Sequence, residues 1–309
     1  MEIERELASV SPQKETIITI GVFDGVHAGH RYLLERLRRQ AINRSLLSAV
    51  VTFDPHPQSV LHPNKPLAYL SNLEDRINTF RELGIDVIAV LTFSPDVAKL
   101  TARQFMYLVK RQLKMRHLMV GSDFTLGQDR HGNAQLLSAL GREMKFGVEI
   151  IPPYTVNGEV VSSTLIRQAL AQGDMQKVRR LMGHYFCLRG KTITSDKRGR
   201  ILGFPTANLD VKPQQASPGN GVYATLTYVD GKRFSSATNI GIRPTFGGTK
   251  KLLETHLLNY DGDLHDREIK VEFVRKLRNE QRFPSSEELR AQIARDVQEV
   301  EAIFAEGLK

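Results

Sequence analysis

Two histidines, His27 and His30, stand three residues apart in the segment GVFDGVHAGH (residues 21–30), between an apolar run and an amphipathic stretch. Residues at i and i+3 share one face of a helix, so both rings can point toward one ligand from a first helical turn. Glycines let a backbone approach a phosphate, and a helix N-terminus offers unpaired N–H groups with a positive dipole. Two imidazoles can donate hydrogen bonds to an α-phosphate under attack and stabilise its developing charge.

Other interpretations of this segment stay open from the residues alone. A histidine pair can hold zinc, but that requires further ligands, and neither a cysteine nor a clear third histidine stands nearby. The two histidines could also be a helix cap and a surface residue. Asp24 could belong to the phosphate site or only fix the loop, and the sequence does not decide between them.

A second polar group lies in the turn-rich segment GFPTAN (residues 203–208). Thr206 and Asn208 present oxygens two residues apart, and alternate residues of an extended strand point the same way. Oxygen ligands suit Mg²⁺, which takes few protein groups and completes its shell with phosphates and water. A structural turn explains the same residues. Glu254, further along, stands on an expected strand, where a lone Glu is usually structural.

A third group is Ser162-Ser163-Thr164-Leu-Ile-Arg167. Two hydroxyls and an arginine at the start of a helix can form a second phosphate cradle. The alternative is an ordinary serine N-cap followed by an exposed arginine.

The first half of the chain must position the histidine segment. Apolar strand patterns alternate there with amphipathic helices, which predicts an α/β fold with a doubly wound, mostly parallel sheet. The expected strands are residues 16–22, 47–53, 86–92, 117–121 and 148–151. Such sheets bind ligands at the C-terminal ends of their strands, where the histidine segment lies. Ser71-x-x-Glu74 and Thr101-x-x-Gln104 have the spacing of capping boxes that open helices.

The pattern changes near residue 184, after a helical stretch at residues 163–182. Several short strands then predict a small antiparallel barrel, with a hairpin turn at Asp230-Gly231. The expected strands are residues 186–194, 222–229, 234–239, 252–260 and 268–274. A final helix, capped by Ser285-x-x-Glu288, carries an apolar stripe that we expect to pack on the barrel. The stripe consists of Leu289, Ile293, Val297, Val300 and Ile303. The predicted domains are residues 1–183 and 184–309.

The chain has 309 residues, 41% of them hydrophobic and 25% charged, which is ample for two globular domains. Lys and Arg exceed Asp and Glu by 23 to 18 in residues 1–183 and by 20 to 16 in residues 184–309. The net charge of +9 is therefore spread along the chain. Without a basic tail, this excess favours a surface that tolerates nucleotides over a nucleic-acid partner.

The single cysteine, Cys187, excludes an internal disulfide and a cysteine zinc cluster. No apolar run approaches the roughly 18 residues that a membrane span needs. The acidic N-terminus lacks the features of a signal peptide. We therefore expect a cytoplasmic protein with neither a membrane nor a nucleic-acid partner; the sequence does not indicate an oligomeric state.

The segment at residues 21–30 resembles the HxGH signature of the nucleotidyltransferase superfamily, in the form found in bacterial bifunctional riboflavin kinase/FAD synthetases. Three more segments of the first half resemble that family's TFxPHP, GxDFxFG and SSTxIR motifs: residues 52–57, 121–127 and 162–167. In the second half, the family's PTAN, NIGxRPTF and ExH motifs are matched by residues 205–208, 239–247 and 253–257. The resemblance covers roughly residues 15–305.

The resemblance implies an FMN adenylyltransferase in residues 1–183 and a riboflavin kinase in residues 184–309. ATP would phosphorylate the 5′-hydroxyl of riboflavin, and the phosphate of FMN would then attack the α-phosphate of a second ATP, giving FAD and pyrophosphate. The implied cofactor is Mg²⁺, with riboflavin, FMN and ATP as small-molecule substrates. Glu254 would be the base of the kinase, and His27 and His30 would stabilise charge in the adenylyl transfer.

The resemblance also implies binding roles for further residues. Those expected to contact ATP or phosphate are Gly21, Phe23, Asp24, Gly29, Ser163, Thr164, Arg167, Gly203 and Pro205. Those expected to contact flavin are Phe53, Pro55, Pro57, Asp123, Phe124 and Arg243, and those expected to hold the metal are Thr206 and Asn208. Departures from the family's pattern are Thr125, Leu126, Ser195, Asn259, His265 and Asp266.

Three alternative functions remain. The chain could be an enzyme with one live site, either a kinase or an adenylyltransferase. It could be a flavin-binding carrier or sensor, although a carrier has no use for two triphosphate sites. It could be a nucleotidyltransferase for another acceptor, which would leave the segments around Thr206 and Glu254 unexplained.

Overall fold

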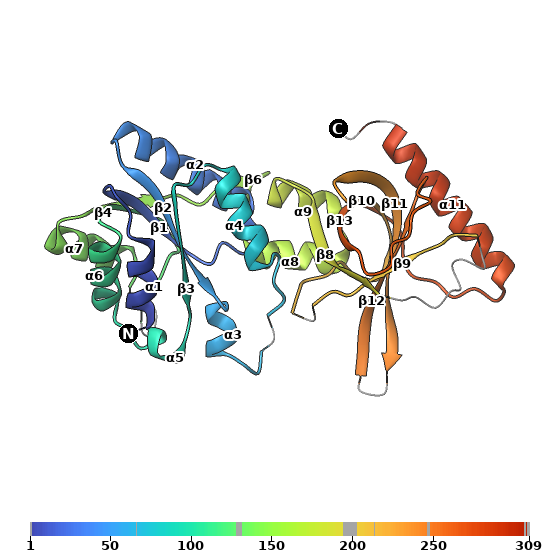
Figure 1. Ribbon diagram of the computed structural model, residues 1–309, viewed down its shortest axis with the longest axis horizontal. Helices are drawn as coiled ribbons and strands as arrows, with labels where there is room; N and C mark the ends of the chain where they lie inside the picture. Colours follow the sequence, from blue (N-terminus) through green and yellow to red (C-terminus); the bar gives the residue numbers. More distant parts are fainter. Residues whose placement is uncertain are drawn as a thin grey trace. The chain divides into compact units, whose positions relative to one another are not determined.

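A computed structural model (Figure 1) describes residues 2–65, 67–127, 132–193, 203–212, 214–245, 248–305 and 307, apart from the side chains of residues 243–245 and 248–250. Internal contacts divide the chain into two units, Met1–Ser163 and Thr164–Lys309. This division falls before the helical stretch at residues 163–182, whereas the sequence predicted a boundary after it. Each unit is described by itself below.

The first unit is built on a parallel sheet of five strands. The strands are β1 (Thr16–Ile20), β2 (Leu47–Asp54), β3 (Val87–Thr92), β4 (Met115–Gly121) and β5 (Gly147–Ile151). They lie in the order β3-β2-β1-β4-β5, and every neighbouring pair is parallel. All five residues of β1 are buried, which explains why its sequence is a continuous apolar run. The doubly wound sheet predicted from the sequence is confirmed.

Helices pack on both faces of this sheet (Figure 1). One buried cluster joins the sheet to α1 (Glu2–Val10), α6 (Ala102–Gln112) and α7 (Ala134–Met144). A second cluster joins it to α2 (Ala28–Asn43) and α4 (Leu73–Glu82). Shorter elements of this unit are η1 (Asp24–Val26), α3 (Pro57–Leu61), α5 (Pro95–Ala98), β6 (Thr155–Val156) and β7 (Glu159–Val160).

The N-terminal helix α1 was not anticipated from the sequence. Its buried side chains, Ile3 and Leu7, are one turn apart on one face. Glu6 accepts hydrogen bonds from the backbone N–H of Thr92 at 3.0 Å and from its hydroxyl at 2.6 Å. Val10 packs against the same cluster, so Ile3, Leu7 and Val10 form a short apolar stripe at helical spacing.

The two predicted capping boxes have different outcomes. Thr101 and Gln104 form the predicted box at the start of α6. The box predicted for Ser71 is wrong, because Asn72 caps α4 by accepting the N–H of Asp75 at 2.7 Å. The Ser71 hydroxyl instead accepts the N–H of Gly25 at 2.8 Å. Ser71 therefore bonds to a residue that is distant in the sequence instead of capping the helix, and no local pattern shows this.

The second unit contains the predicted antiparallel barrel, which is closed and has the strand order β10-β11-β12-β9-β8-β13. Its strands are β8 (Phe186–Ile193), β9 (Ala207–Leu209), β10 (Gly221–Val229), β11 (Lys232–Thr245), β12 (Gly248–Leu257) and β13 (Glu268–Arg278). The turn between β10 and β11 is the predicted one, since Asp230 and Gly231 have φ angles of 47° and 77° and Val229 pairs with Lys232.

The barrel holds a network of fully buried hydroxyl groups. The Thr238 hydroxyl lies 2.6 Å from that of Thr225 and donates to that of Thr255 at 2.9 Å. The Thr227 and Ser236 hydroxyls are 2.7 Å apart. Because each of these groups has a partner, the interior avoids the penalty of an unsatisfied buried polar group. Alternate residues of a strand face opposite sides, so Glu254, next to Thr255, lies on the other face of β12.

Three helices complete this unit: α8 (Ser163–Gln172), α9 (Met175–Met182) and α11 (Ser286–Ala305). The predicted helical stretch at residues 163–182 is thus two helices, separated at Gly173, which has a φ of 76°. A Cβ at Gly173 would lie 2.8 Å from the Tyr223 hydroxyl, so this position also needs a glycine for space. The final helix packs on the barrel through Val300 and Ile303, as predicted.

Candidate active sites

Three of the singled-out segments follow neighbouring strands of the parallel sheet. The segment at residues 52–57 ends β2, the segment at 21–30 follows β1, and the segment at 121–127 follows β4. Because β2, β1 and β4 are adjacent and parallel, their carboxyl ends share one edge of the sheet. The strand order reverses between β1 and β4, and such a reversal is where doubly wound sheets bind ligands.

The loop after β1 reverses direction tightly before α2. Phe23 and Val26 have left-handed φ angles of 55° and 35°, and Gly25 has a φ of 78°. A Cβ at Gly21 would lie 3.1 Å from the Phe23 ring, and one at Gly29 would lie 3.3 Å from the His27 ring. The loop therefore delivers the N-terminus of α2, whose cap is His27, to the edge of the sheet.

The two histidine rings are stacked, with centroids 3.5 Å apart and planes at 15°. His27 Nδ1 accepts the backbone N–H of His30 at 3.3 Å, so the proton of a neutral His27 lies on Nε2. His30 Nδ1 is buried and has no hydrogen-bond partner within the described part of the chain. Burial, and then the neighbouring His27, hold the pKa of His30 well below its usual 6.5.

This geometry refines the chemistry expected of the histidine pair. Two rings in face-to-face contact strongly disfavour carrying a positive charge together. With its lowered pKa, His30 is neutral at pH 7. It therefore offers a hydrogen bond rather than a positive charge, and His27 is expected to donate through Nε2. Positive potential must come from the N-terminus of α2 and from other cations.

Side chains far along the sequence fix this loop. The buried Asp24 carboxylate accepts the backbone N–H groups of Leu70 at 2.9 Å and Ser71 at 3.2 Å. Ser71 in turn holds Gly25. The Ser163 hydroxyl donates to the Asp24 carbonyl oxygen at 3.2 Å. These contacts support the interpretation of Asp24 as the residue that fixes the loop, which the sequence had left open.

Arg76, on α4, was missed by sequence reasoning. It is 3% exposed, and its guanidinium donates to the carbonyl oxygens of Val22 at 2.7 Å and Phe53 at 3.3 Å and pairs with Asp54 at 3.3 Å. It thereby ties the loop that follows β1 to the last two residues of β2. Burial lowers the pKa of Arg76 from its ordinary value, although Asp24 and Asp54 oppose the shift. Nothing in the local pattern of α4 distinguishes Arg76 from its exposed arginine neighbour Arg81.

The residues expected to contact flavin occupy varied surroundings. Phe53 is half-buried and packs at the edge of the core against Phe93 and Phe105, with ring centroids 5.7 Å and 6.1 Å away. Pro55 is exposed and follows a cis peptide bond, and Pro57 opens α3. Asp123 is exposed at the end of β4, and Phe124 packs against the core.

The second site is built on paired strands. Glu254 of β12 lies directly opposite Asn208 of β9 on one side and opposite Asn239 of β11 on the other. Directly opposed residues put their side chains on the same face, with Cβ atoms about 5 Å apart. The ladder therefore brings together residues 208 and 254, which the sequence separates widely. The prediction that Asn208 and Glu254 share a site agrees with this register.

Asn208 has the properties of a metal ligand. It is 4% exposed, and its Oδ1 atom is buried with no hydrogen-bond partner among the described residues. Thr206 precedes it by two positions and is half-buried. A buried, unused amide oxygen beside a carboxylate fits Mg²⁺, which prefers oxygen ligands. The described residues contain no group of three or more His, Cys, Asp or Glu side chains that could hold a metal ion. They therefore give no support to the alternative of a zinc site.

The histidine of the ExH motif was given no role from the sequence. His256, two positions after Glu254, hydrogen-bonds through Nδ1 to the Pro205 carbonyl oxygen at 2.8 Å. Its ring also meets the edge of Phe204, with centroids 5.5 Å apart. It therefore anchors the segment that carries Thr206 and Asn208 to β12, while Gly203 before it takes a left-handed φ of 85°.

Some predicted residues cannot be assigned to these arrangements. The Arg243 side chain and Ser195 lie outside the described residues. Thr164 and Arg167 lie on α8, in the second unit. Ser163 of the same motif contacts the loop at residues 21–30 through its hydroxyl group.

Comparison with known proteins identifies both halves of the chain. Residues 9–165 match the family model of FAD synthetase, and residues 182–304 match that of riboflavin kinase. The bifunctional riboflavin kinase/FMN adenylyltransferase of Escherichia coli K12 is 40% identical over 290 residues, which are 93% of this chain and 92% of that protein. The protein of the same name from Bacillus subtilis is 33% identical over 297 residues, 95% of this chain and 94% of that one.

A solved structure has the same fold over nearly the whole chain. It is described as a macrolide-efflux protein from Streptococcus pneumoniae, and it superposes with a TM-score of 0.90 at 25% identity. The match covers 97% of each chain. Within the described residues, none of the helices combines the length and apolar character needed to cross a membrane.

Proposed function

The chain belongs to the family of bifunctional riboflavin kinase/FMN adenylyltransferases, and we propose that each of its two described sites carries one of the two reactions. The enzyme uses ATP to phosphorylate riboflavin to FMN and then to adenylylate FMN to FAD, with release of pyrophosphate. Its substrates are small molecules. The register that opposes Glu254 to Asn208, far apart in the sequence, is the observation that most supports the assignment of the kinase site.

We assign the adenylyl transfer to the histidine site within the proposed domain of residues 1–183. The phosphate of FMN is already anionic near pH 7, so the attack on the α-phosphate needs no protein base. His27 and His30 donate hydrogen bonds to the phosphate, and the N-terminus of α2 adds positive potential. The glycine-shaped loop lets the backbone approach ATP, through Gly21, Phe23 and Gly29.

The remaining contacts of this site are proposals from the motifs. Ser163, Thr164 and Arg167 would bind phosphate, and the hydrogen bond from Ser163 to the histidine loop supports that placement for the first of them. The flavin would lie against the segments that end β2 and β4. The half-buried Phe53 and the exposed Asp123 at that edge are consistent with this proposal.

We assign the kinase reaction to the barrel, in the proposed domain of residues 184–309. Glu254 accepts the proton of the riboflavin 5′-hydroxyl as that oxygen attacks the γ-phosphate. Thr206 and Asn208 would hold Mg²⁺, which when bound neutralises charge on the phosphates. Gly203 and Pro205 shape the loop that we expect to approach ATP. Arg243 is proposed as a flavin contact from its motif alone.

The reactions consume ATP, and we propose that they take place in the cytoplasm. A time course with riboflavin, ATP and Mg²⁺, resolved by chromatography, tests the two activities together. FMN that rises and then converts to FAD supports both sites. If FMN accumulates and no FAD forms, even when FMN is supplied directly, the histidine site has no adenylyltransferase activity.

The metal assignment has its own test. Asn208→Ala should raise the Mg²⁺ concentration for half-maximal kinase activity by about tenfold, because it removes an oxygen ligand. Asn279→Ala, at an exposed asparagine of the same unit, is the matched control. Equal Mg²⁺ dependence in the two variants would remove Asn208 from the metal site.

A further inference from the structure

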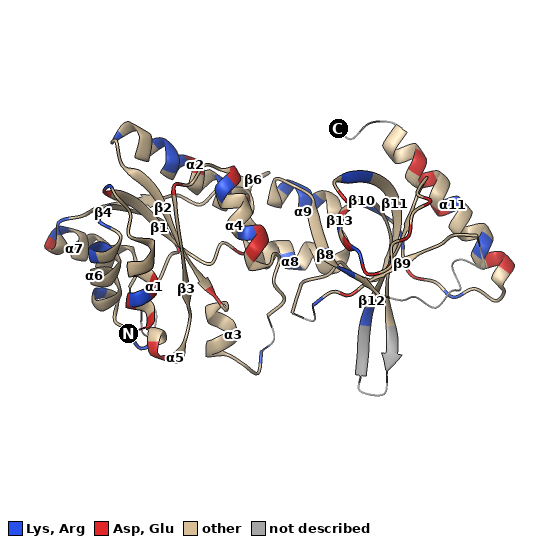
Figure 2. Cartoon of the chain, viewed as in Figure 1, with Lys and Arg blue, Asp and Glu red and all other residues tan. Residues whose placement is uncertain are grey.

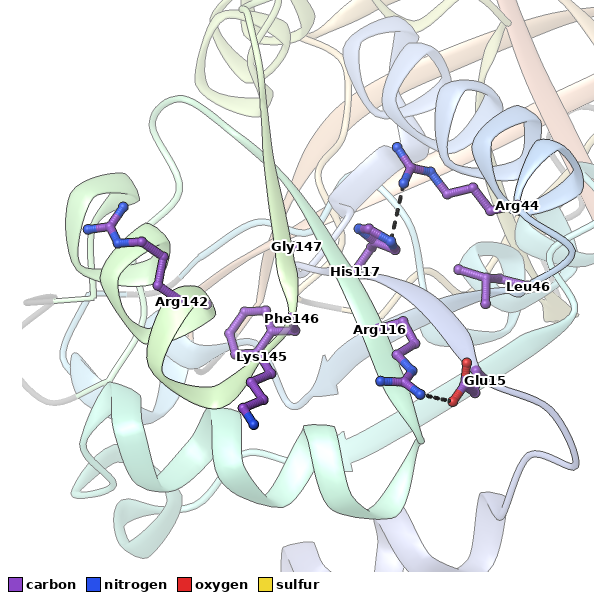
Figure 3. Close-up of a pocket in the computed structure, with 10 residues that line it drawn as sticks. Glu15, Arg44, Leu46, Arg116, His117, Arg142, Lys145, Phe146 and Gly147 are labelled. Carbon is purple, nitrogen blue, oxygen red and sulfur yellow. Dashed lines mark hydrogen bonds and ion pairs between the residues drawn. The ribbon is translucent and has the colours of Figure 1, made fainter.

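A pocket of about 560 Å³ lies in the first unit at the edge of the sheet opposite the histidine site (Figure 3). Its residues include Glu15, Leu46, Arg116 and Gly147, which lie at or next to the first residues of β1, β2, β4 and β5. The histidine loop follows the last residue of β1. The pocket is therefore separated from that site by the length of the strands.

The pocket is rich in positive charge. Arg44, Arg116, Arg142 and Lys145 line it, and Glu15 is the one carboxylate among its lining residues. Basic residues elsewhere are scattered over both units (Figure 2), so this grouping does not follow from a basic tail or helix. Four cations that line one open pocket repel each other unless an anion lies between them.

The ends of helices offset only part of this charge. Arg44 is the C-cap of α2 and Lys145 is the C-cap of α7, so both lie at the negative ends of helices. Each helix end is equivalent to about −0.5 elementary charge, so two ends and Glu15 together contribute about −2. The four cations contribute four positive charges, which leaves a clear excess. Complementing the helix ends does not account for the whole cluster.

The four cations of the pocket differ in their hydrogen bonds and ion pairs. Arg116 pairs with Glu15 at 2.6 Å, and Arg44 donates to His117 Nε2 at 3.2 Å (Figure 3). Arg142 and Lys145 are exposed, and their side chains have no hydrogen bond or ion pair with another described residue. The pocket thus combines an anchored pair of arginines with two unpaired cations on the end of α7 that are free to turn toward a ligand.

His117 completes the anchored side. A Cβ at Gly147 would lie 2.2 Å from His117 Nδ1, so the glycine makes room for the imidazole beside β5. Burial, and then Arg44, lower the pKa of His117, while Glu149 opposes the shift and Arg116 adds to it. A neutral His117 can accept the hydrogen bond from Arg44 and so orient that guanidinium.

We propose that this pocket binds a compact polyphosphate anion, separate from both active sites. The cations stand on three elements, at the ends of α2 and α7 and at the start of β4, and a chain of phosphoryl groups offers them more oxygen atoms than a single phosphate does. Guanidinium groups suit this ligand because they donate paired hydrogen bonds to phosphate oxygens. The inference does not depend on the activities assigned above, because it uses none of their residues.

Calorimetric titration of the full chain with inorganic tripolyphosphate, without Mg²⁺ or flavin, tests the proposal. Arg116→Gln combined with Lys145→Gln should weaken the pocket's binding by about tenfold or more, because two charges are lost. Lys99→Gln combined with Arg111→Gln removes one paired and one unpaired cation outside the pocket and should leave binding unchanged. Tripolyphosphate bound at the active sites contributes equally in all the chains.

A change of opposite sign sharpens the test. Glu15→Gln removes the carboxylate that competes for Arg116, so it should strengthen binding by about threefold. The ring resonances of His117, followed by NMR, should shift as tripolyphosphate is added, and the anion should raise the pKa of His117. The proposal would be overturned if all variants bound tripolyphosphate with equal affinity and the His117 resonances did not shift. It would also be overturned if the Arg116/Lys145 variant bound more tightly.

Discussion

The two proposed sites, the histidine site and the barrel site, would each have to place a triphosphate, and they are built in different ways. The histidine site stands on loops at the end of a parallel sheet, and its shape depends on anchors such as Asp24 and Arg76. The barrel site stands on two paired strands, where the backbone ladder itself fixes Glu254 opposite Asn208. Loss of one distant side chain can displace a loop. The pairing of two strands depends on many backbone hydrogen bonds, so loss of one side chain changes it less.

The largest effect is expected from Glu254→Gln, which removes the proposed base without changing the size of the side chain. Kinase turnover should fall by about 10²–10⁴-fold, while adenylylation of added FMN stays within twofold. Glu268→Gln, an exposed strand glutamate of the same unit, is the matched control. Loss of both activities in the Glu254 variant would show that the two sites are not independent.

His30→Ala should produce the opposite split. It removes a hydrogen-bond donor to the phosphate, so adenylylation should fall by about 10²–10³-fold while FMN formation continues. Separate assays with riboflavin and with FMN measure the two effects. His265→Ala, in the other unit, makes the same chemical change and should leave adenylylation intact. FAD synthesis at the normal rate in His30→Ala would remove this residue from the site.

Arg76→Met tests whether the loop-built site depends on its distant anchor. The change leaves the carbonyl oxygens of Val22 and Phe53 without their donor, which should destabilise the first unit by about 3 kcal/mol. Adenylylation should fall by about tenfold in kcat/KM, whereas the kinase should stay within twofold.

Arg81→Met, at an exposed position of the same helix, is the control for Arg76 and should change stability by no more than about 0.5 kcal/mol. Denaturant unfolding and the two assays provide the measurements. If Arg76→Met keeps full adenylylation, the loop does not need this anchor.

The smallest effect concerns pH. Burial lowers the pKa of His30 in the folded chain below its value of about 6.5 in the unfolded chain. The unfolded chain then binds more protons just below pH 6.5, so the free energy of unfolding should fall as the pH falls from 6.5. His30→Asn should flatten this dependence between pH 6.5 and 5, as measured by thermal unfolding. The same slope in both proteins would contradict the buried, neutral state of His30.

Much of the fold was predictable because its signals are local. The apolar run of β1, the turn at Asp230-Gly231 and the Thr101–Gln104 capping box each depend on residues within a few positions of one another. The role of Ser71 was not predictable in this way, because its partner Gly25 lies 46 residues away in the sequence.

The sequence by itself determined the two architectures, the order of the motifs and the residue types able to bind phosphate and metal. Tertiary structure decided that Asp24 holds the backbone of a distant segment and that Arg76 joins the loop after β1 to the end of β2. It also placed Glu254 opposite Asn208, whose amide oxygen is buried. It also gathered the cations around the pocket at the opposite edge of the sheet. The physical reason is range: periodicity and capping act within a few residues, whereas burial and charge pairing depend on which distant segments the fold brings together.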